Sequence, residues 1–166
     1  MPAEHRYRIS TEWTGNRGTG TSGYRDYSRN HVIRAEGLPE LLGSADRAFH
    51  GDRERWNPEL LLLAALSECH MLSFLHVALR HDVRVTAYRD QSEAALRLNP
   101  DGSGEFSSAT LRPEVETAEP VGTVIMQQLH AEASALCFMA RSVNFPVRHE
   151  LSENPERPEE LEGRGD

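Results

Sequence analysis

The 166-residue sequence contains no lysine, so all 18 of its basic residues are arginines. Schiff-base and pyridoxal-phosphate chemistry both require a lysine amine, and the sequence therefore excludes them. Any cation that serves a site must be a protonated histidine or an arginine, which is always charged and makes forked contacts with anions.

Other absences narrow the class of protein further. The formal net charge of −8 argues against nucleic acid and against an anionic membrane surface as partners. No uninterrupted apolar run approaches the roughly 18 residues of a membrane-spanning helix. Residues 1–7 also lack the apolar segment of a signal peptide. We therefore expect a soluble, cytoplasmic protein without a membrane partner.

The most informative stretch is residues 57–80, which predict one long helix. Asn57 is a good N-cap, and Pro58 fits the first helical position, where a missing N–H costs nothing. Apolar residues then occupy almost every side of the predicted helix, so we expect it to be buried. Cys69, one of only two cysteines, lies in its interior.

The rest of the chain predicts strands on both sides of this helix and a second helix near the end. Alternating apolar residues predict strands at 6–13, 24–35, 83–88, 94–98 and 105–115, and a short final strand beginning at 145–147. The second helix is predicted at 121–140 and includes Cys137. This order predicts an α+β fold with helices on an antiparallel sheet. We place one domain at 1–150 and a disordered, acidic, Pro-rich tail at 151–166.

The two cysteines leave several interpretations open, because they form neither a Cys-x-x-Cys motif nor a metal-ligand spacing. They are inert buried thiols, a structural disulfide, which a reducing cytosol disfavours, or a catalytic pair of peroxidatic and resolving thiols. Zinc is a weaker alternative, since His70 and His76 are six residues apart and do not share a helix face. We interpret both histidines as ordinary polar contacts.

Two longer motifs resemble a known family. They are Asn57-Pro58-Glu59 followed by a Leu/Ala run and Ser67-Glu68-Cys69-His70-Met71, and His130-Ala131-Glu132 followed by Cys137-Phe138-Met139-Ala140-Arg141-Ser142. The early segment Gly20-Thr21-Ser22-Gly23-Tyr24-Arg25 matches as well. From about residue 7 to residue 150 the sequence resembles the OsmC/Ohr family (osmotically inducible protein C and organic hydroperoxide resistance protein), nearer to the OsmC branch.

The resemblance implies an intertwined homodimer in which antiparallel sheets wrap around two long buried helices. It also implies a peroxiredoxin-like thiol peroxidase that reduces organic hydroperoxides to alcohols in oxidative or osmotic stress defence. Cys69 would be the peroxidatic thiolate and Cys137 the resolving thiol, with a disulfide between them as an intermediate. Arg25 would hold the thiolate and Glu59 would orient that arginine, with Arg29 as a second match.

The same resemblance implies which other molecules take part. The reductant would be an external thiol, in this family usually a dihydrolipoyl group on a lipoylated protein, and no metal, flavin or haem cofactor is needed. Glu59 and Cys69 are about 15 Å apart along a continuous helix, so we expect Glu59 to act across the dimer. Two alternatives remain: a non-catalytic OsmC-like dimer that binds an apolar small molecule, and a structural α+β dimer with two inert thiols.

Overall fold

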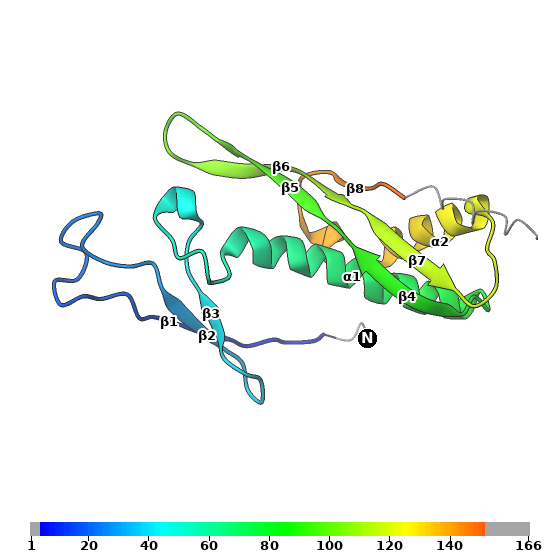
Figure 1. The fold of residues 1–166 in the computed structure, drawn as a ribbon, viewed down its shortest axis with the longest axis horizontal. Helices are drawn as coiled ribbons and strands as arrows, with labels where there is room; N and C mark the ends of the chain where they lie inside the picture. The colour runs from blue at the N-terminus through cyan, green and yellow to red at the C-terminus, as the bar shows by residue number, and fades with distance from the viewer. Residues whose placement is uncertain (1–3, 152–166) are drawn as a thin grey trace, which may run out of the picture. The chain divides into compact units, whose positions relative to one another are not determined.

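The computed structural model describes residues 4–151 of the chain. The chain divides into two compact units, residues 1–65 and residues 66–166, and the long helix α1 (Pro58–Arg80) runs from the first unit into the second. The predicted α+β class is confirmed, since two helices combine with three small sheets (Figure 1). Residues 152–166 of the predicted tail lie outside the described residues.

The first unit contains a three-stranded antiparallel sheet in the order β1-β2-β3. Its strands are β1 (Ser10–Trp13), β2 (His31–Arg34) and β3 (Leu41–Gly43), and a short 3-10 helix, η1 (Arg47–Phe49), follows. The strand predicted at 24–35 is therefore too long. Arg29 donates from its guanidinium to the carbonyls of Tyr24 and Tyr27, so these two carbonyls are held in a turn rather than in a sheet.

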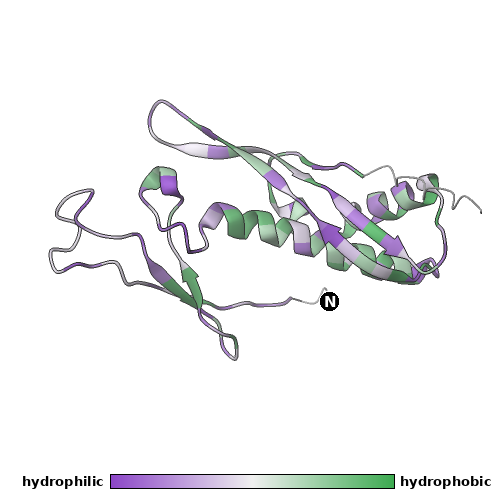
Figure 2. Ribbon diagram, in the orientation of Figure 1, coloured by the Kyte–Doolittle hydropathy of each residue, from purple (hydrophilic) through white to green (hydrophobic). Residues whose placement is uncertain are grey.

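The start of α1 confirms the predicted cap. The Asn57 side-chain oxygen accepts the backbone N–H of Leu60 at 2.8 Å, which satisfies one of the unpaired donors of the first turn. Figure 2 shows that hydrophobic residues follow along the helix. The single chain buries only a stripe of them, however: Leu66, His70, Phe74, Val77 and Ala78. The predicted burial on all sides is thus not achieved within one chain.

Helix α1 is also long and apolar enough to cross a membrane by length and composition. Its 23 residues include an 18-residue window with a mean hydropathy of 1.7. Its uninterrupted apolar runs are shorter, because polar residues such as Ser67 and His70 interrupt them. The core helix of a soluble protein has the same length and composition, so these two properties do not place α1 in a membrane.

The second unit contains two sheets. One is the antiparallel pair β4 (Val85–Asp90) and β7 (Pro113–Thr117). The other has the order β5-β6-β8, with β5 (Glu93–Leu98) antiparallel to β6 (Gly104–Leu111) and β8 (Val147–His149) parallel to β6. The strand predicted at 105–115 is two strands, because Arg112 separates β6 from β7 and each pairs in a different sheet.

Helix α2 (Thr123–Leu136) completes the second unit, followed by the 3-10 turn η2 (Ala140–Ser142). Phe74, Val77 and Ala78 of α1 form a core with Leu129 and Ala133 of α2. Side chains of β4 and β7 pack against this core, and in Figure 1 these strands lie over the C-terminal half of α1. The two helices and the β4–β7 sheet therefore form the hydrophobic core of the second unit.

Candidate active site

The two cysteines belong to different elements of the second unit, Cys69 to α1 and Cys137 to the C-cap of α2. Cys69 is half-buried in the interior of α1, as predicted. Cys137 is not inside a helix: α2 ends at Leu136, and Cys137 has extended backbone at its C-cap, with only 1% of its surface exposed. The backbone N–H of Ala140 donates to the Cys137 sulfur at 3.5 Å. A helix end followed by a tight turn thus fixes this thiol.

The structure brings the two thiols together. Burial, together with the adjacent Cys69 thiol, raises the pKa of Cys137 to about 11, although the hydrogen bond from the Ala140 N–H works in the opposite direction. Cys137 is therefore protonated at neutral pH. Of the two, Cys69 is the more accessible to a small molecule from outside.

The other two predicted site residues belong to the first unit. Arg25 has an exposed side chain in the loop before β2. Glu59 lies in the first turn of α1, and its Oε2 atom is buried without a hydrogen-bond partner among residues 4–151. A buried carboxylate oxygen that lacks a donor is costly, so Glu59 requires a partner that the described part of a single chain does not supply.

Arg29 is held far more firmly than Arg25. Its Nη1 and Nη2 atoms donate to the carbonyls of Tyr27 and Tyr24 at 2.9 and 2.7 Å, and its Cζ lies 4.3 and 4.4 Å from the centres of the same two rings. No acidic side chain between residues 4 and 151 forms an ion pair with it. Arg29 is thus a half-buried, preorganised cation without a counter-ion in the described chain.

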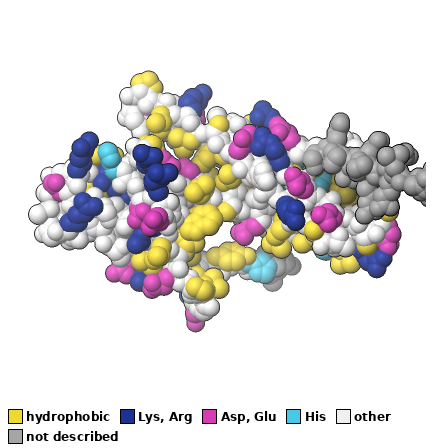
Figure 3. Space-filling view, in the orientation of Figure 1, with side chains coloured by type: hydrophobic (Ala, Val, Ile, Leu, Met, Phe, Trp, Pro, Cys, Tyr) yellow, Lys and Arg dark blue, Asp and Glu magenta, His cyan; other side chains and the backbone are white. Residues whose placement is uncertain are grey.

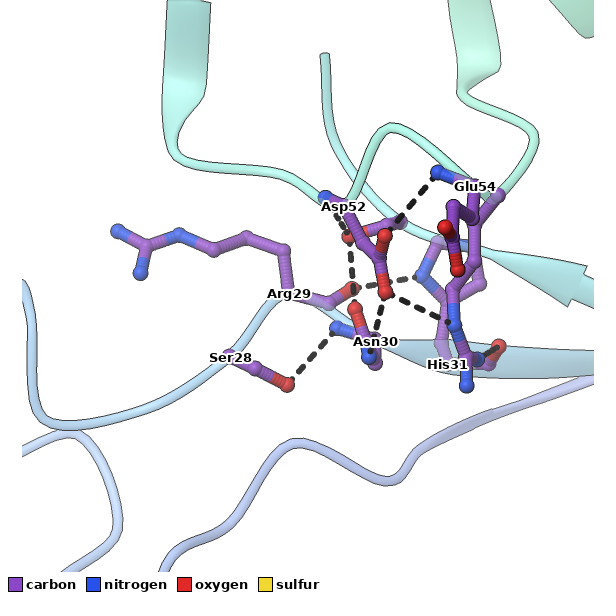
Figure 4. A network of polar contacts seen from close by, with 8 residues as sticks. Ser28, Arg29, Asn30, His31, Asp52 and Glu54 are labelled. Carbon is purple, nitrogen blue, oxygen red and sulfur yellow. Dashed lines mark hydrogen bonds and ion pairs between the residues drawn. The ribbon is translucent and has the colours of Figure 1, made fainter. Parts of the chain in front are cut away.

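A polar network fixes the backbone beside Arg29 (Figure 4). Buried Ser44 donates to Asn30 at 2.9 Å and accepts the backbone N–H of Asp52 at 3.0 Å. His31 Nδ1 lies 3.0 Å from the carbonyl oxygen of Arg29. In the same figure the Arg29 side chain extends away from this group. The network therefore holds the main chain in place, while the Arg29 guanidinium contacts the rings of Tyr24 and Tyr27.

Arg29 lines a largely apolar cavity of the first unit. The cavity has a volume of about 400 Å³ and is lined by Trp13, Thr21, Tyr27, Arg29, His31, Ser44, Ala45 and Pro58. Pro58 directly precedes Glu59. The cavity thus places Arg29, rather than the exposed Arg25, near the start of α1.

Three histidines form a second cluster, which the sequence analysis did not anticipate. His70 of α1 is fully buried, with its Nε2 atom 3.0 Å from Nδ1 of His130 in α2. Their rings are stacked, and the ring of His149 in β8 lies 4.0 Å from that of His70. Burial is the main cause that lowers the pKa of His70 to about 3 and of His130 to about 4, and it also lowers that of His149. At neutral pH these imidazoles are uncharged.

Asp90 is the acidic group next to this cluster, and its charge partly opposes the lowering of the histidine pKa values. Its carboxylate accepts hydrogen bonds from the Ser67 and Ser92 hydroxyls and from the backbone N–H of Arg112. His130 in turn lines a cavity of about 870 Å³ between the β4–β7 sheet and α2. One member of the histidine cluster, His130, therefore lines this cavity, while another, His70, lies in the interior of the second unit.

The interpretation of His70 as an ordinary polar contact was incomplete. His70 directly follows Cys69, and His130 lies on the same face of α2 as Cys137, two turns earlier, so both belong to the motifs that carry the cysteines. Within residues 4–151 no group of three or more His, Cys, Asp or Glu side chains is arranged to hold a metal ion. The cluster is therefore a hydrogen-bonded stack of neutral rings.

Solved structures share this fold. An OsmC-like protein of unknown function from Vibrio cholerae is 28% identical, with a TM-score of 0.76 over 89% of this chain and 99% of that one. An organic hydroperoxide resistance protein OsmC from Legionella pneumophila is 18% identical, with a TM-score of 0.68 over 90% and 97%. The organic hydroperoxide resistance protein OhrB of Bacillus subtilis is 20% identical, with a TM-score of 0.63 over 89% and 98%.

The last two relatives are distant enough that they support the fold alone. A search of curated proteins found no match. The family model described as OsmC-like protein, however, matches residues 50–152, which include both cysteines and Glu59. The predicted resemblance is thereby confirmed: this chain belongs to the family of OsmC-like proteins.

Proposed function

We propose that this protein is a cysteine-dependent peroxidase that reduces organic hydroperoxides to alcohols. The observation that carries the proposal is the pair of adjacent thiols, Cys69 accessible and Cys137 buried, in a member of the OsmC-like family. Organic hydroperoxides are chosen as the substrate class because two proteins that share this fold are named organic hydroperoxide resistance proteins.

In the proposed reaction Cys69 reacts first. Its thiolate attacks the distal oxygen of the hydroperoxide, so that an S–O bond forms, the O–O bond breaks, and the leaving alkoxide takes up a proton to become the alcohol. The resulting sulfenic acid then meets the Cys137 thiol. An S–S bond forms, the S–O bond breaks, and the hydroxyl group leaves as water with the Cys137 proton. Cys137 suits this second role because it is protonated and withdrawn from substrate.

A thiolate in an apolar surrounding needs a cation, and in this lysine-free chain the cation is an arginine. The resemblance assigned Arg25, and Arg25 stays a candidate. The geometry favours Arg29, because its guanidinium is preorganised and lacks a counter-ion among the described residues, and because Arg29 lines an apolar cavity. Glu59 has a buried oxygen in need of a donor, which a guanidinium would satisfy.

The proposal includes a homodimer. Apolar side chains remain exposed on both helices of the single chain, with Leu72 61% and Leu79 73% exposed on α1 and Phe138 74% exposed after α2. Figure 3 likewise shows hydrophobic side chains at the surface over α1. An apolar helix face of this kind is stable in water when a partner covers it. In the dimer, Glu59 would act on the arginine beside the partner's Cys69.

The proposed cycle needs an external dithiol and no bound cofactor. A dithiol, such as a dihydrolipoyl group, reduces the Cys69–Cys137 disulfide by exchange through a mixed disulfide. The cytoplasm is the compartment in which such reductants are maintained, and we assign the protein to it on that ground.

The test is the consumption of cumene hydroperoxide with dithiothreitol or dihydrolipoamide as the reductant. We expect turnover by the wild-type protein, none by Cys69→Ser, and a single round of peroxide reduction without sustained turnover by Cys137→Ser. Ser73→Ala, a change on α1 that spares both thiols, is the matched control and should keep full activity. Inactivity of the wild type with both reductants would rule out the peroxidase and favour the non-catalytic dimer that binds an apolar ligand.

A further inference from the structure

The His70–His130 hydrogen bond joins the same two helices that carry the two cysteines. His70 is adjacent to Cys69 in α1, and His130 lies two turns before Cys137 on the same face of α2. The bond is 3.0 Å long, and His70 is fully buried and His130 97% buried. Among the described residues, no other side-chain hydrogen bond joins a buried side chain of α1 to a buried side chain of α2.

The surroundings of the pair indicate which nitrogen carries the proton. His70 Nδ1 is buried without a partner among the described residues, so we assign it as the unprotonated nitrogen, because an orphaned N–H is the rarer case in protein interiors. His70 Nε2–H then donates to His130 Nδ1. Phe74 stacks on the His130 ring at 4.1 Å and holds its orientation.

We propose that His70 and His130 are positioning residues for disulfide formation, whose hydrogen bond holds Cys69 and Cys137 within reach of each other. The inference builds on the proposed Cys69–Cys137 cycle. Without the bond α1 and α2 can shift against each other, and the effective concentration of one thiol at the other falls. Neither histidine touches the substrate in this role.

Burial is the main cause that keeps the hydrogen-bonded pair neutral, and His149 acts in the same direction. Asp90 of β4 and His149 of β8 are titratable groups that act on both rings. The Asp90 carboxylate is already bound by two hydroxyls and a backbone N–H. The histidine pair therefore persists across the neutral pH range.

The test exploits the two different nitrogens of the bond. Asparagine places its amide close to the position of a histidine Nδ1, and glutamine places its amide close to that of Nε2. His130→Asn and His70→Gln should therefore keep the contact, whereas His130→Gln and His70→Asn should lose it. The two variants at each position both bury an amide there, so a general loss of packing affects both of them alike. His76→Gln, at an exposed position of α1, is the control.

The measured quantity is the equilibrium between the protein dithiol and oxidised dithiothreitol, followed by alkylation and mass spectrometry. The two protein thiols lose two electrons and two protons, and the dithiothreitol disulfide gains them. We expect the equilibrium constant for the Cys69–Cys137 disulfide to fall about tenfold in His130→Gln and His70→Asn. It should stay within about threefold of wild type in His130→Asn, His70→Gln and His76→Gln.

Equal constants within each pair of variants would overturn the inference. If the His130 variants do not fold, the His70 pair decides. This readout is independent of peroxide chemistry: a wild-type protein that forms the disulfide without consuming hydroperoxide would contradict the proposed function and leave the positioning role intact. A peroxidase whose disulfide equilibrium is the same in all variants would retain the function and lose the positioning role.

Discussion

At the scale of single residues, the two arginines that compete for the thiolate differ in how they are held. Arg29 makes two hydrogen bonds to backbone carbonyls and lies against two tyrosine rings, while Arg25 is exposed. A bound guanidinium loses little entropy when an anion approaches, which favours Arg29 as the functional cation.

The first prediction follows from this difference. Arg29→Gln should reduce the rate of Cys69 oxidation by cumene hydroperoxide about tenfold or more at pH 7, because an adjacent cation lowers a thiol pKa by one to three pH units. Arg25→Gln should change the rate less than threefold. The rates are measured in a single turnover, with trapping of the sulfenic acid. The opposite ranking of the two variants would restore Arg25 as the residue that holds the thiolate.

Residue identity in the sequence was enough to single out the two cysteines but not the histidine cluster. Cys69 and Cys137 stand out because there are only two cysteines and each lies in a recognisable motif. His70, His130 and His149 come together only because α1, α2 and β8 converge, and no local spacing encodes that convergence. The environment of a buried polar residue depends on contacts between distant segments.

At the scale of elements, local signals located the helix start well. Asn57 caps α1 through a 2.8 Å bond to the Leu60 N–H and is itself 8% exposed. Replacing Asn57 with Ala should lower the free energy of unfolding by about 1 kcal/mol, the usual worth of a cap. Urea denaturation measures this loss. Asn57→Ser keeps a capping oxygen without placing a second carboxylate beside Asp46, so it is the control and should be close to wild type. Equal losses in both variants would contradict the capping role.

The errors of the sequence analysis concern elements that tertiary contacts cut short. The strand predicted at 105–115 alternates throughout, but its two halves pair with different strands, β5 and β4. The helix predicted at 121–140 ends at Leu136, because the backbone of Cys137 is extended. The parallel pairing of β8 with β6 also could not be predicted, since pairing direction depends on the path of the chain between them.

The histidine cluster gives the packing of α1, α2 and β8 a pH dependence. Because the folded-state pKa values of His70 and His130 are about 3 and 4, below the usual 6.5, the unfolded chain binds more protons in the interval between. The free energy of unfolding therefore rises with pH. This contribution is complete above about pH 6.5 and is lost as the pH falls from 6.5 toward 4, by about 1.4 kcal/mol per pH unit for each histidine.

Urea denaturation of the wild type and of His130→Asn between pH 4 and pH 8 measures this contribution. The variant has one fewer titrating imidazole in the cluster, so its stability should fall less steeply between pH 6.5 and pH 4. His76→Gln, which removes an exposed imidazole from α1, should follow the wild-type curve. Parallel curves for the wild type and His130→Asn would show that His130 does not titrate differently in the folded protein.

At the scale of the whole molecule, the composition of α1 exceeds what one chain can bury. The sequence predicts a helix buried on all sides, yet Leu72 and Leu79 remain 61% and 73% exposed in the single chain. Both the family assignment and the uncovered surface of α1 lead us to expect that a second copy of the chain covers this helix. The sequence alone supplies the first argument, and the exposed side chains become visible only in the structure.

The dimer is tested by placing a charge on this surface. Leu72→Glu should be harmless in a monomer, since the side chain is exposed there, but it would bury an unpaired carboxylate at a subunit interface, which costs several kcal/mol. We expect light scattering after size-exclusion chromatography to show a dimer for the wild type and a monomer for Leu72→Glu. Glu68→Gln, an exposed change one turn earlier on α1, is the control and should stay dimeric.

Because Glu59 is expected to act on the arginine beside the partner's Cys69, the monomeric variant should also lose peroxidase activity while both of its thiols remain intact. A fully active monomer would contradict the shared site, and a dimeric Leu72→Glu variant would move the interface elsewhere on the molecule.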